Sequence, residues 1–415
     1  MQILWVKGGK LLPVDTGGKI RSYNILRHLA RNHPVTLLSY YGSARDLHYE
    51  ATIKQNLPGA ETIHTAAPEA TLAQSLDYIF RLPSKAPYAV TKFTDSKVRS
   101  TVRQWLSARR FDVAVCDFLS ASLNFPEQLP VPAVLFQHNV ETVLWQRLAE
   151  VEASPLRRLA YRIEAGKMAR YERETLARFH SVIAVSDHDR NQMLAFNPNC
   201  SITVVPTGVD TEQYGVAPPA SASPPVVVFT GSMDWEPNLD AVEYFCREIW
   251  PQVLVAFPDA RFQIVGRNPH ARVRRLASPS VEVTGTVSSV ADYLRAATVV
   301  VVPLRIGGGT RLKIFEAMAM GKAVVSTTIG AEGLDVVHGR DLLLADTSAA
   351  FAENIVSLLR DSRLRRRYEQ AAAIQAQRYD WARIASRFAT VLGEAISEFR
   401  ANGKLNRAPA LPVSS

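Results

Sequence analysis

Three glycine-rich segments of the sequence could bring backbone amides close to an anionic ligand. They are residues 15–22 (DTGGKIRS), 230–238 (TGSMDWEPN) and 303–327 (PLRIGGGTRLKIFEAMAMGKAVVST), and each follows a strand-like run and opens a helical pattern. Glycine permits close approach of the backbone to a ligand, and the free N–H groups of a helix N-terminus attract anions. None of the three is a Walker A or GxGxxG motif, so the pattern alone does not separate the first from an ordinary tight turn.

The third segment carries the strongest chemical signal. A strand-like run ends at Pro303, and the glycines at 307–309 are followed by Arg311 and Lys313 in the first turn of a helix. Cations at that position oppose the helix dipole, which favours an anion between them and the N–H groups. A diphosphate would satisfy both, and Glu316, one turn further on, could reach sugar hydroxyls. The alternative is that the two cations are only solvated.

A second group of candidates follows a strand-like run in the first half of the chain. His138 stands near Asn139 and Glu141, and a position after a strand favours a functional role over that of a core histidine. Glu141 could orient His138 or an acceptor. Further on, Asp187 and Asp189 flank a histidine in a pattern that resembles a metal-binding motif. They stand at a strand-to-helix turn, so we expect Asp187 to cap a helix and no metal to bind.

The composition is that of a soluble globular protein. Hydrophobic residues make up 47% of the 415 residues and charged residues 21%, which excludes disorder, collagen and coiled coil for most of the chain. The longest apolar runs are strand-sized, well below the ~20 residues of a membrane-spanning helix, and no signal peptide is expected. Cys116, Cys200 and Cys246 are far apart without metal-ligand spacing, which is typical of a reducing, cytoplasmic compartment.

Strand-like and helical segments alternate twice along the chain. The expected strands are 1–6, 35–40, 113–116, 133–137 and 182–185, then 226–229, 261–265, 281–284, 299–302, 323–326 and 342–344. The expected helices are 20–30, 156–179, 239–257, 290–296, 311–320, 349–377 and 381–400, with another capped by Ser186. This alternation predicts α/β domains, each with a doubly wound parallel sheet whose ligands bind beyond the carboxyl ends of the strands.

A proline-rich stretch divides the two halves. Residues 216–225 carry four prolines and no charge, which is typical of a linker between a first domain, 1–215, and a second, 226–380. We expect a final helix, 381–402, to pack back on the first domain, and the tail 403–415 to be disordered.

The order and spacing of these segments resemble glycosyltransferase family 4. The similarity extends over nearly the whole chain and includes, besides the glycine-rich segments, FQHNVE (136–141), VSDHDR (185–190), VVPTGVD (204–210) and QIVGR (263–267). More narrowly, the second and third glycine-rich segments resemble bacterial sugar transferases of exopolysaccharide and lipid-linked glycan synthesis. The resemblance implies the GT-B fold, in which two facing Rossmann-like domains enclose the active site in an interdomain cleft. It also implies a retaining, metal-independent enzyme that uses a nucleoside-diphosphate sugar and no cofactor.

Functional positions of the family can be matched to residues of this sequence. By this resemblance Glu316 holds the nucleotide ribose, and Arg311 and Lys313 clamp the diphosphate and stabilise its charge as it leaves. His138 would contact the donor sugar and phosphate. The other donor-binding positions are Gly17, Gly18, Gly231, Ser232, Gly308, Gly309 and Thr310, and the acceptor-side positions are Lys19, Asn139 and Glu141.

Two positions depart from the family pattern. The first glutamate of the family's pair would fall eight residues before Glu316, where this chain has Gly308, so backbone amides must hold part of the donor sugar. Many members also carry an arginine and a lysine after the first strand of the second domain, where this chain has the sequence GSMDW at 231–235, without the arginine. Arg311 and Lys313 are expected to replace that clamp.

The charge distribution predicts a basic surface in the first domain. The chain carries 48 Lys and Arg against 39 Asp and Glu, and residues 81–110 contain eight bases against one acid, interleaved with Tyr88, Phe93 and Trp105. This segment is either a solvated helix face or a surface that contacts anionic lipid or an acidic acceptor. We expect peripheral contact with an anionic membrane through residues 81–110, at the inner face of the cytoplasmic membrane.

These observations favour a transferase that moves a sugar from a nucleoside-diphosphate sugar to a glycan or lipid-linked glycan in cell-surface polysaccharide synthesis. The alternatives within the same fold are an epimerase and a phosphorylase. An epimerase would need crowded carboxylates, of which only Glu141 and Glu316 are candidates. A non-catalytic protein that binds nucleic acid is a third hypothesis, but no nucleic-acid motif accompanies the basic charge, so no nucleic-acid partner is expected.

Overall fold

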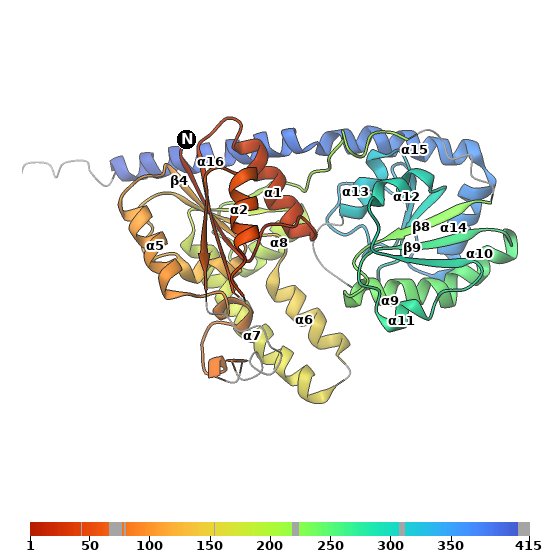
Figure 1. Ribbon diagram of the computed structural model, residues 1–415, viewed down its shortest axis with the longest axis horizontal. Coiled ribbons are helices and arrows are strands. Elements are labelled where there is room, and N and C mark those ends of the chain that lie inside the picture. The colour runs from red at the N-terminus through yellow and green to blue at the C-terminus, as the bar shows by residue number, and fades with distance from the viewer. Residues whose placement is uncertain are drawn as a thin grey trace, which may run out of the picture. The chain divides into compact units, whose positions relative to one another are not determined.

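The computed structural model describes residues 1–42, 44–65, 77–78, 80–152, 154–217, 224–306 and 312–405. These residues form two compact units (Figure 1). Unit 1 comprises residues 1–206 together with the C-terminal helix from Ile384 on, and unit 2 comprises Thr207–Arg383. Each unit has its own parallel sheet, which confirms the expected pair of doubly wound α/β domains.

Unit 1 is built on a seven-stranded parallel sheet in the order β3-β2-β1-β4-β5-β6-β7. Its strands are β1 (Ile3–Gly8), β2 (Val35–Tyr41), β3 (Ala60–His64), β4 (Val113–Asp117), β5 (Ala133–Phe136), β6 (Ser181–Ala184) and β7 (Ile202–Val204). All residues of β4, β5 and β6 are buried, as expected for parallel strands that are covered on both faces. The order reverses between β1 and β4, which is where ligands of such sheets typically bind.

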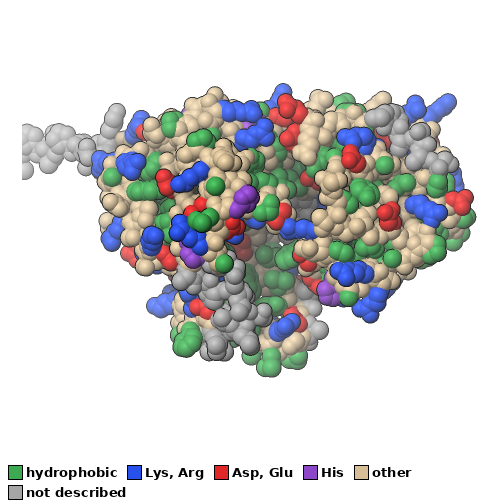
Figure 2. All heavy atoms as spheres, in the orientation of Figure 1, with side chains coloured by type: hydrophobic (Ala, Val, Ile, Leu, Met, Phe, Trp, Pro, Cys, Tyr) green, Lys and Arg blue, Asp and Glu red, His purple; other side chains and the backbone are tan. Residues whose placement is uncertain are grey.

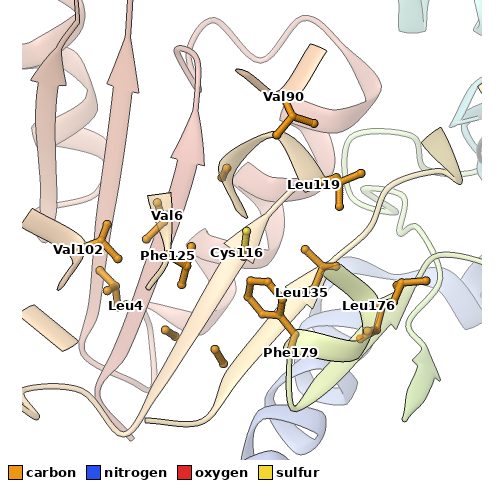
Figure 3. Close-up of a cluster of buried hydrophobic side chains, with 14 of the residues drawn as sticks. Leu4, Val6, Val90, Val102, Cys116, Leu119, Phe125, Leu135, Leu176 and Phe179 are labelled. Atoms are coloured by element: carbon orange, nitrogen blue, oxygen red, sulfur yellow. The ribbon is translucent and has the colours of Figure 1, made fainter. Parts of the chain in front are cut away.

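Helices cover both faces of this sheet. They are α1 (Gly17–Leu29), α2 (Leu47–Asn56), α4 (Tyr88–Thr91), α5 (Ser96–Ser107), η1 (Leu119–Asn124), α6 (Glu141–Val151), α7 (Pro155–Arg178), α8 (Asp187–Phe196) and α16 (Trp381–Leu405). On one face, strand residues such as Leu4 and Leu135 pack with Val102 of α5 and Leu176 of α7 (Figure 3). On the other face Phe388 of α16 stacks on Trp5 with ring centroids 5.3 Å apart. The C-terminal helix is therefore part of the core of unit 1.

Unit 2 has a six-stranded parallel sheet in the order β10-β9-β8-β11-β12-β13. The strands are β8 (Val226–Thr230), β9 (Arg261–Val265), β10 (Val281–Gly285), β11 (Val299–Val302), β12 (Ala323–Ser326) and β13 (Leu343–Leu344). The helices are α9 (Glu236–Tyr244), η2 (Phe245–Ile249), α10 (Trp250–Ala256), α11 (Ala271–Arg274), α12 (Val290–Ala296), α13 (Leu312–Ala319), α14 (Ser348–Arg360), α15 (Ser362–Ala376) and η3 (Gln377–Tyr379). Here the strand order reverses between β8 and β11, so the loops that follow these two strands form the expected ligand-binding point of this unit.

Several boundaries differ from the expected ones. The segment 349–377 is two helices, because the carboxylate of Asp361 accepts hydrogen bonds from the N–H groups of Arg363 and Leu364 and so caps a new helix. Unit 2 begins at Thr207 because the following residues pair with it: the N–H of Val209 donates to the carbonyl of Tyr379 at 2.8 Å. Residues 218–223 of the expected linker and 406–415 of the expected tail lie outside the described residues.

Within the described ranges, every helix is too short or too polar to span a bilayer.

Candidate active site

At the point where the strand order of unit 1 reverses, a buried charged residue lies at the carboxyl end of each of β1 and β4, either last or next to last in the strand. Lys7 of β1 and Asp117 of β4 form an ion pair, with Lys7 Nζ 3.1 Å from Asp117 Oδ2. The indole N–H of Trp5 also donates to that oxygen, at 3.0 Å. Burial alone would raise the pKa of Asp117, but the charge of Lys7 and a hydrogen bond from His138 outweigh it and hold the pKa below its usual range.

His138 connects this ion pair to helix α1. Its Nδ1 lies 2.7 Å from Nη1 of Arg21, and its Nε2 lies 2.7 Å from Oδ1 of Asp117. A guanidinium can only donate, so Nδ1 is the acceptor, and Nε2 carries the proton that is donated to Asp117. Burial lowers the pKa of His138 to about 3, so the ring is neutral near pH 7. Both ring nitrogens are engaged, and His138 therefore serves here as a link between Asp117 and Arg21.

The face of the His138 ring is fixed by an unusual residue. Phe118 stacks on it with ring centroids 3.7 Å apart and an interplanar angle of 3°. Phe118 has a φ of 71°, a conformation that a bulky residue rarely adopts without a functional reason. A Cβ on Gly18 would lie 2.4 Å from Cζ of Phe118. The second glycine of the first glycine-rich segment is therefore required by the phenyl ring that holds His138.

The neighbouring residues of that segment have different surroundings. Gly17 is the exposed first residue of α1. Lys19, expected on the acceptor side, forms an ion pair with Asp15 (Nζ to Oδ1, 3.0 Å) and donates to the carbonyl of Pro13 at 3.3 Å. Lys19 is thus tied to its own segment in this structure, whereas Arg21 is the cation that reaches His138.

A buried glutamate on α7 holds the loop that carries His138. Glu172 accepts hydrogen bonds from the side chain of Gln137, from the backbone N–H groups of Glu141 and Thr142, and from the hydroxyl of Thr142, at 2.6–3.1 Å. A carboxylate at the N-terminus of α6 satisfies amide groups that would otherwise lack partners. Glu172 thereby fixes the loop on both sides of His138.

Glu141 lies next to this carboxylate and is half-buried at the start of α6. Burial and the negative charge of Glu172 raise its pKa to about 7, while a hydrogen bond from Asn139 and the charge of Lys92 act in the opposite direction. A carboxyl group with a pKa near neutrality can give or take a proton under physiological conditions. The structure therefore brings the two expected acceptor-side residues Asn139 and Glu141 together beside His138.

In unit 2 a lysine from α13 reaches the loop that follows β8. Lys313 Nζ donates to Oδ1 of Asn238 at 3.0 Å and lies 4.0 Å from the centre of the Phe229 ring. A Cβ on Gly231 would lie 2.9 Å from the same Nζ. Asn238 also donates to the carbonyl of Ser232 at 2.9 Å, so the ammonium group is held at the backbone of the expected donor-binding loop.

The loop after β8 is packed tightly against the end of β9. A Cβ on Gly266 would lie 1.6 Å from the carbonyl oxygen of Gly231, so no side chain fits there. The guanidinium of Arg267 donates to the hydroxyl of Ser232 at 3.0 Å, and that hydroxyl donates to Asp234 at 2.6 Å. Arg267 therefore brings a second positive charge to the loop 231–235. This is the loop that lacks the arginine found in many members of the family.

The expected ribose-binding residue lies on the same helix as Lys313. Glu316 is half-buried, and its carboxylate accepts a hydrogen bond from the hydroxyl of Tyr214. Burial raises the pKa of Glu316, although Lys313 and Tyr214 oppose that shift. Gly308, Gly309, Thr310 and Arg311 lie outside the described residues, so their expected roles stay predictions.

The aspartates of the DHD segment have other partners. The cap of α8 is Ser186, whose hydroxyl accepts from the N–H of Asp189, and Asp187 instead pairs with Arg190 at 3.0 Å. The expected cap at Ser186 is confirmed, and the expectation that Asp187 caps this helix was wrong, because Ser186 stands one residue earlier, where the N–H groups are free. In the described part of the chain, no group of three or more His, Cys, Asp or Glu side chains is arranged to hold a metal.

Several residues of these two sites were missed in the sequence. Lys7, Asp117, Glu172 and Arg267 all line the positions described above. Lys7 and Asp117 could have been found as charged residues at the ends of apolar strands, since a charge is placed there only with a partner. Nothing in the sequence pattern of α7 distinguishes Glu172 from its exposed neighbours.

Comparisons with known proteins agree with this architecture. Residues 16–213 match the family model described as Glycosyltransferase Family 4, and residues 224–361 match that described as Glycosyl transferases group 1. Together the two matches span most of the chain, which belongs to the glycosyltransferases and has the GT-B class of paired Rossmann-like domains.

Individual relatives can be named. The chain is 29% identical to a phosphatidyl-myo-inositol mannosyltransferase of Mycobacterium leprae, over 79% of this chain and 85% of the relative. Its fold is similar to that of sucrose-phosphate synthase from Thermosynechococcus elongatus, with a TM-score of 0.70 at 17% identity over 96% of this chain and all of the other. It is also similar to Anabaena HepE, solved with UDP and glucose, with a TM-score of 0.65 at 16% identity over 95% and 99% of the two chains.

Proposed function

We propose that this glycosyltransferase uses a nucleoside-diphosphate sugar as donor and holds the diphosphate in unit 2 through Lys313. The observation that carries the proposal is the position of the Lys313 ammonium at the backbone of Gly231, where β8 ends and the strand order reverses. Parallel sheets typically bind ligands at such points, and a lysine near backbone amides suits a phosphate. Arg267 at Ser232 adds a second positive charge. Arg311 is proposed to complete the clamp.

The proposed reaction retains the anomeric configuration. The bond between the anomeric carbon and the diphosphate oxygen breaks, a bond to the acceptor oxygen forms on the same face, and the acceptor proton passes to the leaving diphosphate. Lys313 would stabilise the negative charge that develops on the diphosphate, which is the kind of electrostatic assistance that contributes most in such reactions. Glu316 would bind the ribose hydroxyls, exchanging its hydrogen bond from Tyr214 for one from the nucleotide.

Unit 1 is proposed to bind the acceptor near His138 and Glu141. The pKa of Glu141 near 7 allows this carboxyl to accept a hydrogen bond from, or donate one to, an acceptor hydroxyl. Because the Mycobacterium leprae relative is named for transfer of mannose to phosphatidyl-myo-inositol, we propose a glycan or lipid-linked acceptor. Asp187 and Asp189 are engaged by Arg190 and Ser186, which supports a reaction that needs no metal.

Contact with an anionic membrane is proposed through the cations of the segment 81–110, without the aromatic side chains that were expected to take part. Phe93 and Trp105 of the segment 81–110 pack on the core of unit 1, and Arg81 pairs with Asp77 at 2.8 Å. These aromatic rings are therefore occupied within the protein. Lys85 and the cations of α5 remain available for anionic lipid.

Exposed apolar side chains occur next to that segment. Leu156, at 82% exposure, lies on one stripe of α7 with the exposed Leu159 and Ile163, and Phe80 is 81% exposed. Lys167 of α7 donates to the carbonyl of Leu82 at 2.7 Å, so the stripe and the segment adjoin. Hydrophobic side chains are visible at the lower end of unit 1 in Figure 2, where Figure 1 has the α6–α7 hairpin. Arg157 and Arg162, also on α7, supply the charge that anionic lipid requires.

Two experiments test these proposals. Incubation with UDP-, GDP- and ADP-sugars and a phosphatidylinositol acceptor, followed by NMR of the product, should show transfer with the donor's anomeric configuration, undiminished by excess EDTA. Inverted product or full loss of activity on chelation contradicts the proposed chemistry.

For the membrane contact, replacing Leu156 and Leu159 by serine should abolish cosedimentation with anionic vesicles. Serine at Val255, an isolated exposed residue of unit 2, should have no effect.

A further inference from the structure

Unit 1 contains a second hollow, away from the site at His138. It has a volume of about 800 Å³, within the range of about 300–1,000 Å³ that small-molecule sites occupy. Its lining comes from α5, from the loop 125–130 that leads into the amino end of β5, and from Arg178 at the end of α7, which leads into the amino end of β6. It therefore lies toward the opposite edge of the sheet from His138, which follows the carboxyl end of β5.

The charge of this hollow is unbalanced. Arg99, Arg103 and Arg178 line it, against the single carboxylate of Glu127. For the first two arginines no ion pair is found among the described residues. Three guanidinium groups around one open volume repel each other unless an anion lies between them.

Within the described part of the chain, the guanidinium of Arg178 has one donor that is hydrogen-bonded and one that is not. Its Nη2 donates to the carbonyl of Ser122 at 2.5 Å, which holds the guanidinium in place. Its Nε is buried without a hydrogen-bond partner among the described residues. Leaving such a donor unsatisfied is unfavourable, yet the guanidinium is kept in the lining of the hollow, where an anion can reach it.

The rest of the lining of the hollow is mainly apolar. It includes Leu123, Phe125, Pro126, Leu129 and Pro130. The ring of Phe125 packs edge-on against Phe179, with centroids 5.5 Å apart. A ligand that suits both the arginines and the apolar residues of this lining has an anionic group and an apolar or ring-shaped body.

A hollow in unit 2 shows how arginines are arranged when carboxylates of the protein neutralise them. This smaller hollow is also lined by arginines, but there Arg272 pairs with Glu236 at 2.7 Å and with Glu243 at 2.6 Å. The charge of that guanidinium is neutralised inside the protein. No such neutralisation is found for the described arginines of the hollow in unit 1.

We propose that this hollow binds a phosphate-bearing ligand with an apolar body, in addition to the donor and acceptor of the transferase reaction. Guanidinium groups bind phosphate oxygens in pairs of parallel hydrogen bonds, which makes several arginines around one volume a typical phosphate site. The phosphate could belong to a soluble phosphorylated compound or to the headgroup of a phospholipid. The site is independent of nucleotide binding in unit 2.

The test uses phenyl phosphate, inorganic phosphate and vesicles that contain phosphatidylglycerol as probes of the full-length protein. Wild type should show a saturable rise in Tm with phenyl phosphate, larger than with inorganic phosphate. In Arg103→Gln, which alters an exposed side chain and should fold, the apparent Kd should be at least about tenfold weaker. Lys54→Gln removes one positive charge from an exposed position on α2, outside the hollow and outside the proposed membrane surface, and should leave the Kd unchanged. Arg178→Gln, if folded, should lose the response.

The probes also separate the two sources of phosphate. An Arg103-dependent rise in Tm with phenyl phosphate indicates a soluble ligand, and Arg103-dependent binding to vesicles without that rise indicates a lipid headgroup. If neither probe binds saturably, or if Arg103→Gln and Lys54→Gln respond alike, the proposal is wrong. Nucleotide binding measured on the same variants should not change, so failure here is distinguishable from failure of the proposed donor site.

Discussion

Lys313 occupies the space that a side chain of residue 231 would need. A Cβ built on Gly231 lies 2.9 Å from Lys313 Nζ and 2.8 Å from Asn238 Nδ2. Both distances are too short for real atoms, so glycine at 231 and the ammonium group of Lys313 depend on each other. The second and third glycine-rich segments are thereby joined in one site, through Asn238 and Lys313, which are 75 residues apart in the sequence.

Gly231→Ala should weaken nucleotide binding by displacing Lys313. The added methyl group forces the ammonium away from the loop, and we expect the Kd for the preferred nucleoside diphosphate to rise at least about tenfold, or about 1.4 kcal/mol. Titration calorimetry measures this directly. Gly393→Ala is the matched control, because nothing lies within 4 Å of a Cβ built there. Equal affinity in both variants would contradict the proposed role of Lys313.

Gly18→Ala should destabilise unit 1 through Phe118. The new Cβ would overlap Cζ of Phe118, which is held against His138, and overpacking of this kind costs roughly 1–3 kcal/mol. Shortening Phe118 to leucine in the same chain should recover most of the loss, and thermal unfolding of the two single variants and the double variant measures the coupling. Additive effects of the two substitutions would show that the overlap is relieved elsewhere.

The stability of unit 1 should fall as the pH decreases below 6.5, in part because of His138. Its pKa is about 3 in the folded protein and near 6.5 when unfolded, so the unfolded state binds more protons across this window. The contribution of neutral His138 to the free energy of unfolding is thus fully present above pH 6.5 and is lost toward pH 3. The loss is roughly 2 kcal/mol at pH 5. His138→Gln should flatten this slope in urea unfolding between pH 7 and 5. Parallel slopes in the two proteins would refute the assignment.

Glu141 should titrate near pH 7, and its two charged neighbours should move its pKa in opposite directions. Glu172→Gln removes a repelling charge and should lower the pKa, whereas Lys92→Gln removes an attracting one and should raise it. NMR titration of the carboxyl carbon of Glu141 distinguishes the two. An unchanged pKa in both variants would mean that burial alone controls this group and would contradict the prediction.

The fold was largely predictable because it depends on hydrophobic runs that are local in the sequence. The strand 299–302 and the helix 290–296 have the expected bounds, since four consecutive valines and a capped amphipathic turn are unambiguous signals. The short strands β3 and β7 were missed, because edge strands such as Ala60–His64 bury only some of their residues and have no continuous apolar run.

The site was predictable only in part. Lys313, Gly231 and His138 were identified by their positions after strands, but their partners come from distant parts of the chain. Asp117 and Glu172 act on His138 and its loop only because β4 and α7 pack beside β5. Such contacts depend on strand order, which the sequence does not state.

Binding of a nucleoside diphosphate by Lys313 is the central claim and can be measured directly. Calorimetric titration of the full-length protein with UDP, GDP and ADP should identify one nucleotide that binds. In Lys313→Gln its affinity should fall about 10- to 100-fold, as expected for loss of one charge-assisted contact. Arg366→Gln removes a positive charge from an exposed position on α15 in the same unit and should bind as wild type does. Unchanged affinity in Lys313→Gln, or no binding of any nucleoside diphosphate to the wild-type protein, would contradict the account.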